Sequence, residues 1–295
     1  MEKRKRKPIS REDKVYHAII VPIFVVLMLV CAYPFYYLFI CSISDGKFVD
    51  LGKVIFTPKG LTFDNYVRVL NYKNIFNAAG ISLLRVISGT VLSLVVSSYM
   101  AYFFTKRNMW GRKVWYRLTV ATMYFSAGMI PIYLNYMNLG LLDNFWVYIL
   151  PGALNVYNMI LIKTNIEAMP QELEESAMLD GASYFTRFTR IVIPLIKPIL
   201  ATTALFSAVN HWNDFFCTKM YITNDKLFTM QYLLYELLNQ IKSILDMPDM
   251  GGQASISMTG IKMTLTVVTV IPVMCIYPFI QKFYVKGVMI GAVKG

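Results

Sequence analysis

Residues 16–41 read YHAIIVPIFVVLMLVCAYPFYYLFIC, without one acidic, lysine or arginine side chain. A helix needs about 20 predominantly apolar residues to cross the roughly 30 Å hydrocarbon core of a membrane, and this stretch is longer than that. It is also longer than the apolar core of a signal peptide, and no small-residue cleavage site follows it. We therefore expect a retained membrane-spanning helix near the N-terminus.

Five further apolar runs of similar length follow along the chain. They cover residues 76–103, 115–137, 145–166, 191–216 and 258–281. Proline and glycine interrupt several of them, which membrane helices tolerate where neighbouring helices satisfy the freed backbone groups. We expect an all-α, polytopic membrane protein whose six transmembrane helices pack as a bundle.

The composition of the whole chain supports a membrane protein. Hydrophobic residues make up 56% of the 295 residues and charged residues only 16%, and the mean hydropathy is +0.49. Soluble domains carry about 25% charged residues. A soluble enzyme is therefore not expected, because too few charged groups remain to cover its surface, and the apolar content excludes a disordered chain.

The distribution of basic residues predicts how the chain is oriented. The net charge is +12. Nineteen Lys and Arg residues lie in the two tails and in or beside the loops that follow the second and fourth runs. The loops that follow the first and fifth runs contain eight. Because Lys and Arg accumulate on the cytoplasmic side, both termini are expected there, and the charge calls for no nucleic-acid partner. The expected parts are a basic cytoplasmic tail at 1–15, a six-span domain in the cell membrane at 16–281 and a cytoplasmic tail at 282–295.

No catalytic or metal-binding pattern is present in the sequence. The P-loop, HExxH, GxSxG and EF-hand patterns are missing, and the histidines are His17 and His211 alone. The four cysteines lie in or beside apolar runs without CxxC spacing, so neither a zinc site nor a disulfide framework is predicted. We expect a chain that is not an enzyme and holds no cofactor or metal of its own.

The segment 167–194, which follows the fourth run, differs from the other cytoplasmic segments because it is acidic. Pro170 and the glutamates after it suit the first turn of a helix, and Gly181 suits the left-handed residue that ends one. A second short helix fits 182–190, and Pro194 is expected to begin the next span. The pattern predicts a helix–turn–helix that projects into the cytoplasm and offers Ala177, Met178 and Leu179 to a groove on another protein.

The same segment resembles a known family motif. Glu175-Ser-Ala-Met-Leu-Asp-Gly181, nine residues, and Ile191-Val-Ile-Pro194 are similar to the EAA loop, EAA-x3-G-x9-I-x-L-P, of ABC importer permease subunits. Ser176 and Ile193 are mild departures from it. Flanking matches extend the resemblance to the maltose-type carbohydrate permeases over nearly the whole chain: Met129-Ile-Pro131, Gly140-Leu-Leu-Asp-Asn144, Asp180-Gly-Ala-Ser183 and Trp212-Asn213. The C-terminal residues 281–295 resemble the branch that handles complex oligosaccharides.

This resemblance implies an importer subunit that moves a carbohydrate by ATP-driven alternating access. The implied partners are a second homologous permease subunit, an ATPase dimer that holds ATP and Mg, an extracellular sugar-binding protein, the carbohydrate and membrane lipid. The residues implied to couple the chain to the ATPase are Glu175, Ser176, Ala177, Asp180, Gly181 and Pro194.

Polar and aromatic residues within the spans are candidates for a substrate path. Sugars present C–H faces and many hydroxyls, which aromatic rings, amides and carboxylates bind. The candidates are Asn210, Trp212, Asn213, Asp214, Arg85, Tyr124, Tyr133, Asn155, Tyr157 and Asn158. Two alternatives stay open for them: Trp and Tyr also anchor spans at membrane interfaces, and Arg85 could instead snorkel or pair with a neighbouring helix.

The outer loop 217–257 contains an amphipathic pattern. Its apolar stripe is Met230, Leu233, Leu234, Leu237, Leu238, Ile241, Ile244 and Leu245. We expect a helix that lies at the membrane interface, caps the mouth of the bundle or touches an external partner.

Two rival functions remain at this stage. A permease for a non-sugar solute, such as an amino acid or a polyamine, would have a similar coupling loop. A self-contained secondary transporter would need acidic relays within its spans, and the spans offer little beyond Asp214.

Overall fold

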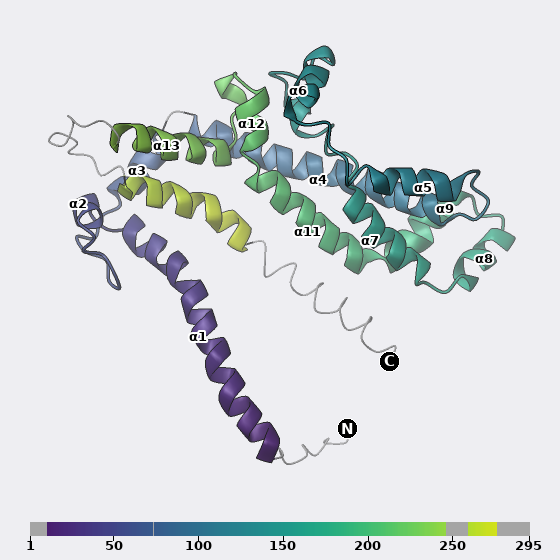
Figure 1. The fold of residues 1–295 in the computed structure, drawn as a ribbon, viewed down its shortest axis with the longest axis horizontal. Helices are drawn as coiled ribbons and strands as arrows, with labels where there is room; N and C mark the ends of the chain where they lie inside the picture. Colours follow the sequence, from purple (N-terminus) through teal and green to yellow (C-terminus); the bar gives the residue numbers. More distant parts are fainter. Residues whose placement is uncertain (1–10, 73, 246–258, 276–295) are drawn as a thin grey trace. The chain divides into compact units, whose positions relative to one another are not determined.

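The computed structural model describes residues 11–72, 74–245 and 259–275. Within these ranges the chain is helical and forms no strand beyond an isolated bridge between Ser44 and Leu61. It divides into two units, Met1–Val69 with Met247–Val268 and Leu70–Asp246 with Thr269–Gly295 (Figure 1). The terminal tails 1–10 and 282–295, the end of the last apolar run and residues 246–258 of the outer loop lie outside the described residues.

The first unit is built on the longest helix of the described chain. Its helices are α1 (Arg11–Ser42), α2 (Gly46–Asp50), α3 (Asp64–Leu70) and the start of a helix over Thr259–Cys275. Ile40, Cys41, Val49 and Val54 form a small core where α1 ends. The 27 residues Tyr16–Ser42 of α1 are long and apolar enough to cross a membrane, and their most apolar window buries none of its residues. Such an exposed apolar surface suits lipid or a partner helix.

The second unit is organised around α4 (Ile75–Thr105), against which α7 (Val156–Glu167) and α11 (Lys197–Asn213) pack. One face of α4 buries small residues at helical spacing: Ala78, Ser82, Gly89, Ser93, Ser97 and Ala101. Large apolar side chains of the same helix stay exposed, among them Leu84, Ile87, Val91 and Val95. Lipid is as apolar as leucine, so small residues that allow close backbone approach mark the packed face of a membrane helix.

The third and fourth apolar runs are not continuous helices. The third is divided into α5 (Arg112–Ala121) and α6 (Met129–Asn138), and the fourth into η1 (Phe145–Tyr148) and α7. Gly128 (φ +84°) precedes α6, and Pro151 lies between η1 and α7. A ten-residue helix is only about 15 Å long, so α5 and α6 are each too short to span a membrane.

The fifth run contains a sharp bend near its start. Tyr184–Leu195 is helical, with a wide turn at η2 (Phe188–Val192), and meets α11 at an angle of 84°. The expectation that Pro194 begins the span is therefore wrong, because Pro194 lies inside α10 (Ile193–Leu195), before the bend, and α11 starts at Lys197. Pro198 accounts for the new start, since proline fits the first turn of a helix. Among the described helices, two are long and apolar enough to span, or three with this bent pair.

The predicted amphipathic helix in the outer loop is present as α13 (Met230–Leu245). The first half of its apolar stripe is buried: Met230, Leu233, Leu234 and Leu237. The helix packs on α4 and on α12 (Phe216–Tyr221). These contacts favour a helix that covers the bundle over one that lies at the membrane interface.

Loops that the charge pattern assigns to the same side of the membrane meet in the second unit. At one end Lys106 pairs with Glu174. At the other end the Asp143 carboxylate accepts hydrogen bonds from the Thr223 hydroxyl and from the backbone N–H of Thr223 and Asn224, which lower the pKa of Asp143. Two pairs of alternate loops therefore meet in the described part of the second unit, as expected of a chain that crosses a membrane repeatedly.

Candidate functional site

The acidic segment forms the helix–turn–helix that its sequence predicts. α8 (Glu172–Leu179) ends at Gly181, whose φ is +79°. The N–H of Ala182 donates to the carbonyl of Ala177 over 3.0 Å, which closes the helix as a left-handed glycine cap does. Ser183 then accepts the N–H of Thr186 and begins α9 (Tyr184–Arg187).

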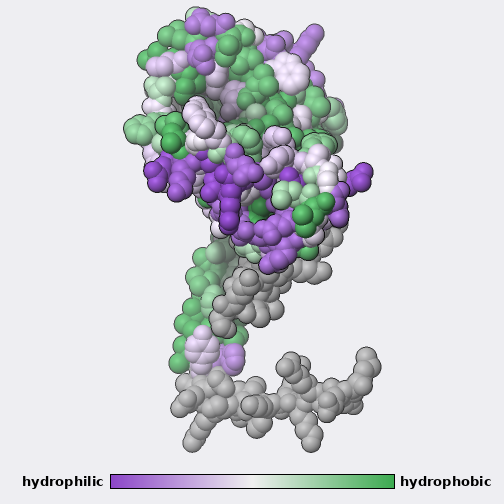
Figure 2. All heavy atoms as spheres, turned by 90° about the vertical axis from the view of Figure 1, so that its right-hand side faces the viewer, coloured by the Kyte–Doolittle hydropathy of each residue, from purple (hydrophilic) through white to green (hydrophobic). Residues whose placement is uncertain are grey.

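The surface of α8 is open and partly apolar. None of its eight residues, all of them described, is buried. Leu179 is 86% exposed and Met178 54%. Hydrophilic side chains gather in a band on this end of the second unit (Figure 2). An exposed leucine and methionine on a short projecting helix form a contact surface of the kind that fits a groove on another protein.

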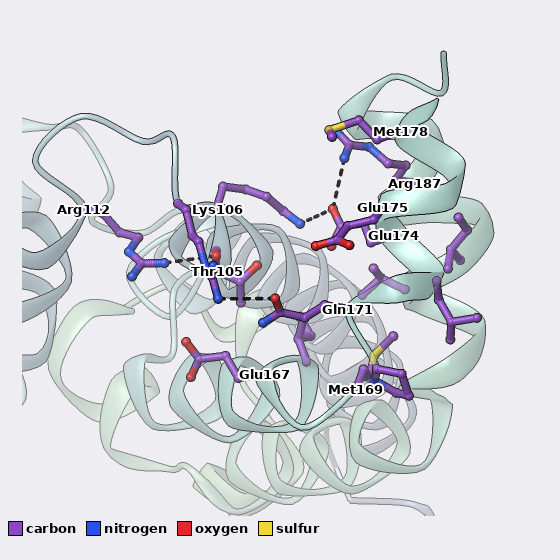
Figure 3. A pocket seen from close by; sticks show the side chains of 16 residues that line it. Thr105, Lys106, Arg112, Glu167, Met169, Gln171, Glu174, Glu175, Met178 and Arg187 are labelled. Atoms are coloured by element: carbon purple, nitrogen blue, oxygen red, sulfur yellow. Dashed lines mark hydrogen bonds and ion pairs between the residues drawn. The ribbon is translucent and has the colours of Figure 1, made fainter. Parts of the chain in front are cut away.

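A cluster of charged side chains joins α8 to the end of α4. Oε1 of Glu174 accepts a hydrogen bond from Nζ of Lys106 and lies 3.5 Å from Nη1 of Arg187 (Figure 3). The same oxygen accepts a hydrogen bond from the Tyr102 hydroxyl over 2.8 Å. Burial by itself would raise the pKa of Glu174. The hydrogen bonds from Lys106 and Tyr102, with the charges of Lys106 and Arg187, outweigh it and lower that pKa. Glu174 is therefore ionised at neutral pH.

One of the predicted coupling residues, Glu175, lines a hollow of about 370 Å³ beside α8. Glu175 lines this hollow together with Lys106, Gln171 and Glu174. The hydroxyl of Ser176 donates to the carbonyl of Glu172, and Ala177 is half-buried. Asp180, Gly181 and Pro194 are exposed.

Sequence reasoning missed the partners of Glu174. Tyr102, Lys106 and Arg187 belong to other elements, and the nearest in sequence is 13 residues away. The sequence does show that the acidic segment 167–194 and the basic loop after the second run, which contains Lys106 and Arg107, are expected on the same side of the membrane. This charge pattern indicates that the two loops attract each other, but it does not indicate which residues form an ion pair.

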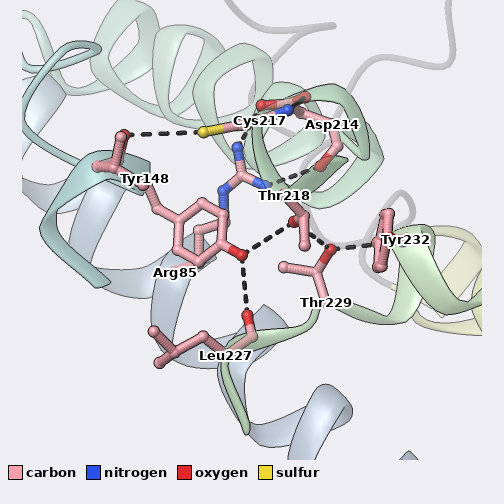
Figure 4. A network of polar contacts seen from close by, with 9 residues as sticks. Arg85, Tyr148, Asp214, Cys217, Thr218, Leu227, Thr229 and Tyr232 are labelled. Carbon is pink, nitrogen blue, oxygen red and sulfur yellow. Dashed lines mark hydrogen bonds and ion pairs between the residues drawn. The ribbon is translucent and has the colours of Figure 1, made fainter. Parts of the chain in front are cut away.

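A second cluster surrounds Arg85, in the middle of α4. The guanidinium donates from Nη1 to the carbonyl of Asp214 over 2.7 Å and from Nη2 to the Asp214 carboxylate, and lies 4.5 Å from the centre of the Tyr148 ring (Figure 4). Arg85 is 2% exposed. Of the alternatives for Arg85, the structure thus shows the pair with a neighbouring helix.

The Tyr148 ring is itself fixed by hydrogen bonds. Its hydroxyl donates to the carbonyl of Leu227 over 2.8 Å and bonds to the Thr218 hydroxyl over 2.9 Å, and Thr218 bonds to Thr229 over 3.0 Å. A cavity of about 470 Å³ opens beside this network, and its polar lining includes Arg85, Asp214, Asn210 and His211. It is large enough for a sugar ring with its hydroxyls.

The other candidates for the substrate path do not line this cavity. The buried Trp212 donates its indole N–H to the carbonyl of Thr269 over 3.0 Å. Asn155 caps α7 by accepting the N–H of Asn158, itself buried. Tyr133 stacks on Tyr221, which lines the cavity. Three further candidates are exposed: Asn213, Tyr124 and Tyr157.

Comparison with known proteins identifies the family. The sequence profile of the binding-protein-dependent transport system inner membrane components matches residues 89–290, which include α8 and most of α4. The chain belongs to this family. The resemblance drawn from its acidic loop is therefore confirmed, and the permease is an all-helical inner membrane component of a transport system.

Individual relatives match along nearly their full lengths. The permease is 38% identical over 266 residues to Protein LplC of Bacillus subtilis (strain 168), with 89% of each chain covered. It is 35% identical over 285 residues to the polygalacturonan/rhamnogalacturonan transport system permease protein YtcP of the same organism, covering 96% of this chain and 100% of the relative. A chain from the crystal structure of a bacterial ABC transporter involved in the import of the acidic polysaccharide alginate superposes with a TM-score of 0.83 at 31% identity, covering 94% of this chain and 99% of the other.

Proposed function

We propose that this permease carries an oligosaccharide across the cell membrane as one of two homologous permease subunits of an ABC importer. A dimeric ATPase with ATP and Mg drives it, and an external sugar-binding protein supplies the substrate. The observation that carries the proposal is α8, a projecting helix with an exposed apolar tip and a charged anchor on α4. The relatives support the substrate class, since the named systems transport polygalacturonan, rhamnogalacturonan and alginate.

In this proposal the chain crosses the membrane six times with both termini in the cytoplasm. The pairs α5–α6 and η1–α7 are then broken spans, whose interrupted backbone is covered by the partner subunit. Glu175, Ser176, Ala177, Asp180, Gly181 and Pro194 form the surface on which the ATPase docks. The cavity beside Arg85 and Asp214 belongs to the substrate path.

The experiment is reconstitution of the purified complex in liposomes that contain its binding protein. Uptake is measured with oligogalacturonides, galacto-oligosaccharides, glutamine and spermidine as probes, with ATP and with a proton or sodium gradient. We expect uptake of a saccharide that requires both ATP and the ATPase subunit. Uptake of glutamine or spermidine alone would contradict the substrate class, and gradient-driven uptake without the ATPase would contradict the mechanism.

A further inference from the structure

Glu174 is the point at which three helical elements of the second unit are joined. Tyr102 lies in the last turn of α4, Lys106 caps that helix, and Arg187 ends α9. All three reach one carboxylate oxygen on α8, and Figure 3 shows two of them, Lys106 and Arg187. None of these contacts lies on the exposed tip of α8 that the ATPase would meet.

The cluster is shielded from water. Tyr102 is 3% exposed and Arg187 6%, and the side chains of Lys106 and Glu174 are 15% and 26% exposed. Nζ of Lys106 also lies 3.7 Å from the centre of the Tyr102 ring. Exposed ion pairs contribute little because water and salt screen them, whereas charge-assisted hydrogen bonds in a shielded site are stronger and depend on direction.

α8 and α9 are attached to the bundle in different ways. The segment after α9 is held by apolar packing: Phe188 packs on Tyr99 and Tyr102, and Val192 and Ile196 are buried against α4 and α7. α8 buries none of its own side chains, all of which are described. Its attachment to the α4 end is therefore polar, through Glu174 and through Gln171, which accepts a hydrogen bond from Arg107 over 3.3 Å.

We propose that Glu174 is a positioning residue for transport, one that transmits displacement of α8 to α4. α4 packs against α7 and α11 and carries Arg85, so a pull on its end reaches the cavity beside Asp214. Without the carboxylate, α8 could move with its docked partner while α4 stays behind. This inference rests on the proposed function, since it assumes that an ATPase moves α8.

The test compares ATP hydrolysed per molecule of substrate transported by the reconstituted complex. Glu174→Gln keeps the size of the side chain and loses its charge, and Glu172→Gln, at an exposed position of the same helix, is the matched control. We expect the complex to assemble and hydrolyse ATP, and the ratio to rise roughly tenfold in Glu174→Gln, because the Gln oxygen still accepts the hydrogen bonds but lacks the charge that strengthens them. Glu172→Gln should match the wild type.

Two variants on α4 separate this tether from a direct contact of Glu174 with the ATPase. Lys106→Gln and Tyr102→Phe remove the partners of Glu174 and leave every side chain of α8 unchanged. We expect both variants to raise the amount of ATP hydrolysed per molecule of substrate transported. They test the inference even if the Glu174→Gln complex fails to assemble. If the ratio is unchanged in both variants, the inference is overturned. The proposed function still stands in that case, provided that the wild-type complex shows ATP-driven uptake. A wild type without ATP-driven uptake would instead overturn the proposed function.

Discussion

At the scale of single residues, Gly89 determines how closely α4 and α11 approach each other. A Cβ atom built on Gly89 would lie 2.4 Å from Nε2 of His211, which is closer than real atoms come. His211 in turn lines the cavity beside Arg85. The absence of a side chain at position 89 thus allows the contact that places His211, and with it the wall of the cavity.

We predict that Gly89→Ala destabilises the permease. The His211 ring would have to shift to admit the new methyl group, and forcing extra volume into a packed site costs about 1–3 kcal/mol. Gly80→Ala is the matched control, because it lies on the same helix with nothing within 4 Å of its added Cβ. It should be neutral or stabilise α4 by roughly 0.5–1 kcal/mol. Tryptophan fluorescence during heating of the detergent-solubilised protein measures both, and equal melting temperatures would contradict the prediction.

At the scale of elements, the direction of α8 depends on the turn that ends it. Gly181 has a left-handed backbone at φ +79°, but a Cβ there would meet nothing within 4 Å. Only the strain of a left-handed backbone therefore disfavours a side chain at this position, because no neighbouring atom would clash with it. The turn separates α8 from α9 and so sets where the exposed Leu179 is presented.

We predict that substitutions at Gly181 impair coupling in the order Val, Ala, Asn. A β-branched residue suits a left-handed conformation least and Asn tolerates it best, with a cost of about 1–2 kcal/mol for an ordinary side chain. Substrate-stimulated ATPase activity of the complex measures the effect, and pull-down of the ATPase subunit measures docking. The same activity in Gly181→Val and Gly181→Asn would show that the turn geometry does not matter.

At the scale of the whole molecule, loops that the charge pattern assigns to one side of the membrane lie at the same end of the second unit. The loop after α4 meets α8 at one end of the second unit. The loop around Asp143 meets residues 223 and 224 at the other end, where Asn74 donates to Asp225 over 3.1 Å. These ends fall on the sides that carry many and few basic residues.

Single cysteines test this orientation, in a variant whose native cysteines are replaced. We predict that Lys53→Cys, at an exposed position in the loop after α1, reacts with a membrane-impermeant maleimide in intact cells. Asn108→Cys, at an exposed position in the loop after α4, should react only after the cells are permeabilised. The reverse pattern would place both termini outside and contradict the docking of a cytoplasmic ATPase.

The parts of the structure that could be predicted from sequence depend on neighbouring residues. Pro170, the glutamates of α8 and Gly181 predict where that helix begins and ends, and the apolar runs predict α1 and α4. The breaks in the third and fourth runs escaped prediction. Glycine and proline in a membrane helix lead to a kink or to a full break according to what packs beside them.

The sequence by itself determined that this chain enters a membrane and to which family it belongs, because composition and short-range pattern carry those properties. Tertiary structure alone decided that Arg85 pairs with Asp214, 129 residues later, that His211 packs on Gly89, and that Tyr102, Lys106 and Arg187 meet at Glu174. A buried charge must find a partner, but its identity depends on which helices pack together, and that choice is made by the shapes of whole helix faces.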